Sequence, residues 1–70
     1  MENWRRIMGA NVRRLRADRG LTQESLSDNA GIHVTYLRGI EAGRRNPSLL
    51  VIGRLAKALS VRPAELLRHL

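Results

Sequence analysis

The 70-residue sequence contains no cysteine and no phenylalanine, and its aromatic side chains are limited to Trp4 and Tyr36. Without cysteine the chain can form neither a disulfide nor a thiolate metal site, and nothing in it points to an oxidising compartment. Its two histidines, His33 and His69, lie far apart and lack the spacing of a zinc site. We therefore expect no metal or other cofactor, and packing of aliphatic side chains must stabilise the fold.

Long hydrophobic runs are also missing. No apolar stretch approaches the ~20 residues that a membrane-spanning helix needs. Only residues 7–10 separate Arg6 from the polar Asn11, which is too short for the hydrophobic region of a secretory signal. We therefore expect the protein to stay in the cytoplasm and to have no membrane partner.

Acidic residues are scarce: six acids face thirteen basic residues, which gives a formal net charge of +7 and an isoelectric point near 11.7. Twelve of the thirteen basic residues are arginines. The guanidinium group of arginine is always charged and donates hydrogen bonds in a planar fork that fits phosphate oxygens. The composition favours a nucleic-acid partner, although a solvated basic surface would explain the charge alone.

The apolar residues that are present follow helical spacing. The series Met8, Val12 and Leu15 predicts a first helix over about residues 4–19, and Gly20 suits its C-terminal end. No alternation typical of β-strands stands out. The periodicity therefore indicates an all-α fold.

Two further helices are expected in the last third of the chain. Ser48 is a good N-cap for a helix with periodic apolar residues. Those residues are Leu49, Ile52, Leu55, Ala56 and Leu59. A last short helix is expected over residues 64–69, because Pro63 suits a first helical position.

The segment 22–42 predicts two short helices joined by a tight turn. Thr22 is a good N-cap for the first of them, and the second is expected from about His33 to Ala42. Between them, Gly31 can take the left-handed backbone conformation at little cost. Two helices packed around such a turn form the helix-turn-helix unit, whose second helix can lie in the major groove of DNA.

Several short motifs follow one another in a fixed order over residues 7–67. They include Met8-Gly9, Gly20-Leu21-Thr22-Gln23-Glu24, Ala30-Gly31-Ile32, Ile40-Glu41 and Asn46-Pro47-Ser48-Leu49. In this combination the chain resembles the Cro/CI-type repressor domain, also called the XRE family. It looks most like small stand-alone members such as restriction-modification controller proteins. The resemblance implies a compact five-helix bundle, one DNA-binding domain over residues 1–70, which binds a near-palindromic operator as a homodimer.

The third helix is expected to read the DNA bases with the face opposite Leu37 and Ile40. The residues on that face are Val34, Thr35, Arg38 and Gly39. Thr35 can exchange a hydrogen bond with a base, and Val34 can only touch a thymine methyl. Arg38 stands where the family commonly has a small polar residue. It can form a fork with guanine or hold a phosphate, and the sequence leaves the two open.

Other residues are expected to hold the DNA backbone. In the family, the residue at Gln23 binds a phosphate and can brace a side chain of the recognition helix. His33 either caps that helix or contacts a phosphate, and the Tyr36 ring can pack while its hydroxyl reaches a phosphate. The loop formed by Arg44, Arg45 and Asn46 clamps the backbone in family members, which we favour over an idle run of charge.

Two further groups have structural roles in this interpretation. The resemblance implies a buried ion pair between Arg16 and Glu41, with Arg19 as a rival partner by spacing alone. Leu66 matches a core position of the family, which leaves Leu67 and Leu70 for a dimer interface.

The leading interpretation is a sequence-specific transcription regulator without catalytic residues. The acids are scattered and no nucleophile stands beside a plausible base. The alternative is the antitoxin of a toxin–antitoxin pair, which would bind a protein. We expect the regulator, because no toxin-binding segment follows the last helix in this sequence. No effector is evident, and the operator and the sign of regulation stay open.

Overall fold

The computed structural model describes residues 3–69, and within them the chain forms five α-helices and no strand. The helices are α1 (Trp4–Asp18), α2 (Gln23–Ala30), α3 (Val34–Glu41), α4 (Leu49–Ala58) and α5 (Pro63–Leu66). This confirms the predicted all-α architecture. None of these helices combines the length and the hydrophobicity that crossing a bilayer requires.

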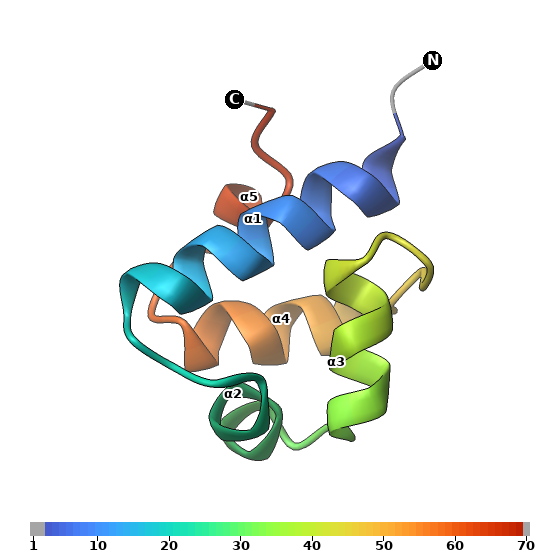
Figure 1. The fold of residues 1–70 in the computed structure, drawn as a ribbon. Helices are drawn as coiled ribbons and strands as arrows, with labels where there is room; N and C mark the ends of the chain where they lie inside the picture. Colours follow the sequence, from blue (N-terminus) through green and yellow to red (C-terminus); the bar gives the residue numbers. More distant parts are fainter. Residues whose placement is uncertain (1–2, 70) are drawn as a thin grey trace.

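Short polar side chains cap three of the five described helices, and the sequence predicts two of these caps. The Thr22 hydroxyl accepts a hydrogen bond from the Ser25 backbone at 3.0 Å, and the Ser48 hydroxyl accepts one from Val51 at 3.2 Å. At the end of α2, Gly31 has φ +70°, a left-handed conformation that glycine adopts without steric cost. This turn sends α3 away from α2 at a steep angle (Figure 1).

A single aliphatic core holds the five helices together. In Figure 1, α4 runs through the middle of the molecule, with α1 above it, α2 below it and α3 at its side. Helix α3 packs against both α1 and α2, and α5 packs against α1 and α4. The buried apolar residues are Met8, Val12, Leu15, Leu26, Ala30, Leu37, Ile40, Ile52, Leu55, Ala56, Leu59 and Leu66.

The last helix is shorter than the sequence predicts. It ends at Leu66, whereas residues 64–69 were expected to be helical. The buried Asn11 side chain explains the difference, because its amide nitrogen donates to the carbonyl oxygens of Leu66 at 2.9 Å and of Arg68 at 2.7 Å. Carbonyls two residues apart are rotated by about 200° in an α-helix. One side chain can therefore reach both only where the chain has left the helix.

The crossing of α1 and α3 depends on Gly9. A Cβ atom at this position would overlap the carbonyl oxygen of Ile40 and lie 2.8 Å from that of Glu41. The backbone of α1 therefore rests directly on the last turn of α3. This contact sets how closely α3, the proposed recognition helix, approaches α1.

Gly9→Ala should lower the free energy of unfolding by about 2–3 kcal/mol, because the added methyl group forces two backbones apart. Gly53→Ala makes the same change within α4, where a Cβ atom meets nothing within 4 Å. That control should stabilise the protein by about 0.5–1 kcal/mol, since alanine is the better helix former. Urea denaturation measures both, and equal stability of the two variants would contradict this account of the crossing.

Candidate nucleic-acid interface

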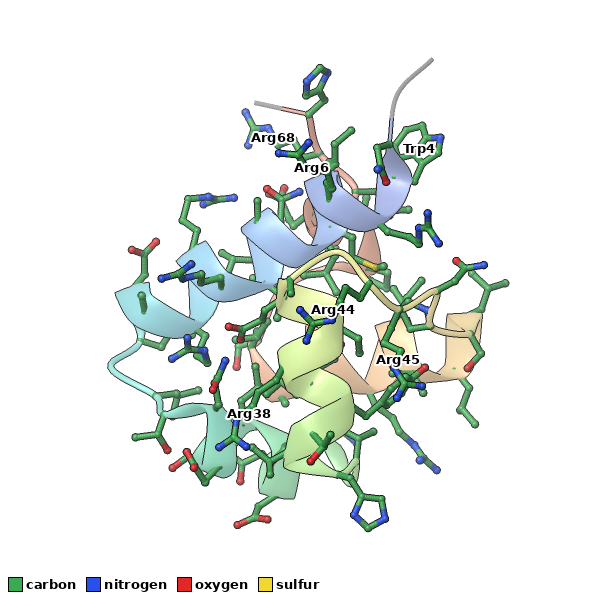
Figure 2. The ribbon with its side chains drawn as sticks, turned by 45° about the vertical axis from the view of Figure 1, so that its right-hand side comes forward. Trp4, Arg6, Arg38, Arg44, Arg45 and Arg68 are labelled. Atoms are coloured by element: carbon green, nitrogen blue, oxygen red, sulfur yellow. The ribbon has the colours of Figure 1, made fainter. Side chains whose placement is uncertain are left out.

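The third helix exposes one face and buries the other. Leu37 and Ile40 are fully buried, whereas Thr35 and Arg38 are exposed and Val34 is half-buried. In Figure 2, Arg38 lies at the left of α3, Arg44 lies in front of its upper end, and Arg45 lies along its right-hand side. Of the residues that the sequence assigns to base reading, Thr35 and Arg38 are therefore exposed, with basic side chains nearby.

A partly buried ion pair connects α1 to the end of α3. The Arg16 guanidinium donates from Nε to Oε2 of Glu41 at 2.7 Å and from Nη2 to Oε1 at 3.0 Å. Its third donor, Nη1, binds the Leu21 carbonyl oxygen at 2.9 Å, and the Glu41 side chain is only 5% exposed. The rival Arg19, which follows the last residue of α1, instead donates to the Leu15 carbonyl oxygen of that helix. The hydrogen bond to Glu41 raises the pKa of Arg16, so this guanidinium stays charged at any ordinary pH.

Hydrogen bonds continue from this ion pair to the exposed face of α3. Oε1 of Glu41 also accepts from Nε2 of Gln23 at 3.1 Å. Oε1 of Gln23 accepts from Nε of Arg38 at 3.2 Å, and Nη2 of Arg38 donates to Glu24 at 3.1 Å. We call these residues, Arg16, Glu41, Gln23, Arg38 and Glu24, the polar network. It joins three helices and ends at a residue assigned to DNA contact.

The sequence predicts no part for Glu24 in the site. Glu24 lies in the first turn of α2, where an acid complements the helix dipole. Its contact with Arg38 spans 14 positions and depends on how α2 and α3 cross. Spacing along one helix gives no signal for such a contact.

The loop after α3 folds back onto that helix. The Arg45 guanidinium lies 5.4 Å from the centre of the Tyr36 ring, a distance typical of cation–π contact. A Cβ atom at Gly39 would lie 2.7 Å from Cγ of Arg45. Gly39 was expected on the exposed face, but it is buried, because the Arg45 stem covers it. The absence of a side chain at Gly39 lets Arg45 lie flat against α3. All three residues of the loop, Arg44, Arg45 and Asn46, remain exposed.

His33 occupies the N-cap position of α3, but its side chain makes no capping hydrogen bond. Caps are normally short side chains that hold an oxygen close to the backbone, which an imidazole ring does not. His33 is exposed, so its ring is free to meet a phosphate.

Arginines of α1 extend the basic surface beyond the predicted residues. A shallow hollow of about 530 Å³ lies between α1 and the end of α3, and Arg6, Arg13 and Arg14 line it. Arg6 also lies against Gly43: a Cβ atom built on Gly43 would be 2.9 Å from Cγ of Arg6. The sequence shows these arginines only as part of its net charge.

Arg16→Met should lower the free energy of unfolding by about 3 kcal/mol, because it leaves the Glu41 carboxylate buried without its cation. Arg13→Met removes the same charge from an exposed position of α1 and should change stability by less than about 0.5 kcal/mol. Urea titration of both variants tests this difference. If Arg16→Met matched Arg13→Met, the ion pair would have no structural role.

Comparison with known proteins assigns the chain to one family. The helix-turn-helix family HTH_3 matches residues 12–66. Control protein C.BamHI of Bacillus amyloliquefaciens is 41% identical, over 93% of this chain and 82% of its own length. The HTH-type transcriptional regulator y4dJ of Sinorhizobium fredii, itself uncharacterized, is 44% identical, over 89% of this chain and 80% of its own.

Among solved structures, the restriction-modification controller protein C.AhdI from Aeromonas hydrophila superposes with a TM-score of 0.86. It is 42% identical, over 89% of this chain and 94% of its own length. These findings confirm the resemblance that the sequence motifs carry. The chain belongs to the HTH_3 helix-turn-helix family and is a sequence-specific DNA-binding regulator of transcription, not an enzyme.

Proposed function

We propose that the protein binds a near-palindromic operator as a homodimer and inserts α3 into the major groove. The observation that carries this proposal is the exposed face of α3, which presents Thr35 and Arg38 while the rest of the helix is fixed against α1 and α2. Side chains near the start of such a helix meet base edges in the groove. In this proposal residues 1–70 act as one DNA-binding domain.

Base reading and backbone contact fall to different residues. Thr35, Arg38 and the half-buried Val34 are proposed to meet bases. The remaining contacts are proposed to be with phosphates, which set the register of the helix. The residues in this second group are Gln23, His33, Tyr36, Arg44, Arg45 and Asn46. Gly39 contributes indirectly, by leaving room for the Arg45 stem.

The exposed leucines suggest where a second copy would bind. Leu66 is fully buried in the core, whereas Leu67 is 38% exposed beside it. Leu70, the other residue expected at the interface, lies outside the described residues. A second group of exposed leucines, Leu49 and Leu50, lies at the start of α4. We propose the interface at Leu67, because it follows the end of α5 and leaves α3 and its loop free for DNA.

The names of the relatives suggest a setting. C.BamHI is named a control protein, and C.AhdI a restriction-modification controller. We propose that this protein likewise controls restriction-modification genes. We also propose that it acts in the cytoplasm, because that compartment holds the chromosome in bacteria such as the sources of these relatives.

Selection of bound sites from random-sequence DNA tests the proposed operator and dimer. The wild type should enrich inverted repeats whose half-sites are about one helical turn, ~34–36 Å, apart. Leu67→Asp should sediment as a folded monomer and bind these repeats much more weakly, because an introduced charge opposes burial of this position.

Leu50→Asp is the matched control, since Leu50 is 64% exposed and lies on α4. It should keep the wild-type assembly and the wild-type sites. Enrichment of single half-sites by the wild type would contradict the dimer. If Leu50→Asp were monomeric and Leu67→Asp dimeric, the interface would lie on α4 instead, and the proposal of an interface at Leu67 would be wrong.

Phosphate contacts should dominate affinity, given the net charge and the arginines around α3. A dimer that neutralises roughly 6–10 phosphates should lose on the order of a thousandfold in affinity between about 50 and 200 mM salt. Arg44→Ala removes one proposed contact from each protomer, so the slope of log K against log salt should become shallower by about 2.

Arg54→Ala is the control for total charge, because Arg54 is exposed on α4, lines a hollow with Gly31 and Lys57, and is not one of the proposed DNA contacts. Its slope should stay close to the wild-type value. Fluorescence anisotropy with a labelled operator measures all three proteins. A nearly flat wild-type plot, or equal slopes for the two variants, would contradict the assignment.

A further inference from the structure

We propose that Glu24 is a positioning residue that, together with Gln23, holds Arg38 in the orientation that reads a guanine. The inference depends on the proposed function, since it concerns how the same α3 face selects bases. It assigns a role to Glu24, and it selects base reading over phosphate binding for Arg38.

The orientation of the Gln23 amide is fixed from inside the protein. A carboxylate can only accept hydrogen bonds, so the Gln23 side chain must turn its Nε2 toward Glu41. Arg16 keeps that carboxylate in place with two hydrogen bonds. The amide oxygen of Gln23 must then face the opposite way, which is where Arg38 lies.

Gln23 and Glu24 together occupy one edge of the Arg38 guanidinium. Nε donates to Gln23 and Nη2 donates to Glu24, and these two nitrogens form the side edge of the planar group. Both hydrogens on Nη1 and the second hydrogen on Nη2 remain. One hydrogen on each of these nitrogens points out of the end of the group, and these two form the pair of parallel donors that fits O6 and N7 of guanine.

The carboxylate of Glu24 also changes what Arg38 prefers to bind. A guanidinium that already faces a carboxylate attracts a phosphate less, because the two negative groups repel each other. Its end donors still match a neutral base edge. Holding the side chain in place before binding also reduces the rotamer freedom that it loses in the groove.

Asp28 provides a matched control for Glu24. Both acids are exposed on α2, one helical turn apart, and removal of either raises the net charge by one. Of these two acids, only Glu24 forms an ion pair with α3 in the described part of the chain. Both variants are expected to fold, because neither side chain is part of the core.

The experiment measures site preference by selection from random-sequence DNA, followed by affinities for operators that differ at one base pair. The wild type should prefer guanine at the base pair read by Arg38 by roughly 5- to 150-fold, and Arg38→Ala should abolish that preference. Glu24→Ala should reduce the preference by about two- to fivefold, the effect expected of an exposed ion pair. Asp28→Ala should keep the wild-type preference, while both acid-to-alanine variants bind all DNA at least as tightly as the wild type.

Each other outcome has a definite meaning. If Glu24→Ala keeps the full preference for guanine, the positioning role is wrong while the proposed function stands. If Arg38→Ala weakens binding to all sequences equally, Arg38 is a phosphate ligand and the inference is wrong. If the wild type prefers no sequence at all, the proposed function itself fails.

Discussion

The ion pair between Arg16 and Glu41 is the interaction on which the proposed recognition surface depends. It lies where α1 crosses the last turn of α3, next to the close backbone contact at Gly9. A buried ion pair adds little net stability, because desolvation of the two charges offsets their attraction. Its charges are satisfied in only one arrangement of the two helices, however. The pair therefore specifies the orientation of α3 more than it strengthens the fold.

From this pair, the direction of each hydrogen bond follows from the chemistry of its groups. Glu41 accepts, so Gln23 must donate to it, and the oxygen of Gln23 is left to accept from Arg38. The Glu41 carboxylate thus orients an exposed side chain that lies two hydrogen bonds away. On the other side of α3, Arg45 lies over Gly39 and Tyr36, so the helix is held from both flanks.

The features that sequence predicts well here are local ones. Helical periodicity gave the core residues of α3, and Thr22 and Ser48 marked two helix starts because a cap needs only its next few residues. The family resemblance led to the contact between Arg16 and Glu41, although spacing alone left Arg19 as an alternative partner.

The features that sequence did not predict depend on contacts between distant parts of the chain. The end of α5 is set by Asn11, which lies 55 positions from Leu66. Gly39 is buried only because the following loop returns over it, and Glu24 reaches Arg38 only because of the angle between α2 and α3. Each of these depends on the three-dimensional packing of helices, which periodicity and capping rules do not contain.

The most direct test of this account is a crystal structure of the protein bound to its selected operator. The polar network of the free protein should persist on DNA, with Gln23 still hydrogen-bonded to Glu41 and Arg38 still hydrogen-bonded to Gln23. The free end of the Arg38 guanidinium should lie at hydrogen-bond distance from guanine O6 and N7. A complex in which Gln23 has left Glu41, or in which Arg38 has turned to a phosphate, would contradict the claim that the interior ion pair orients the reading surface.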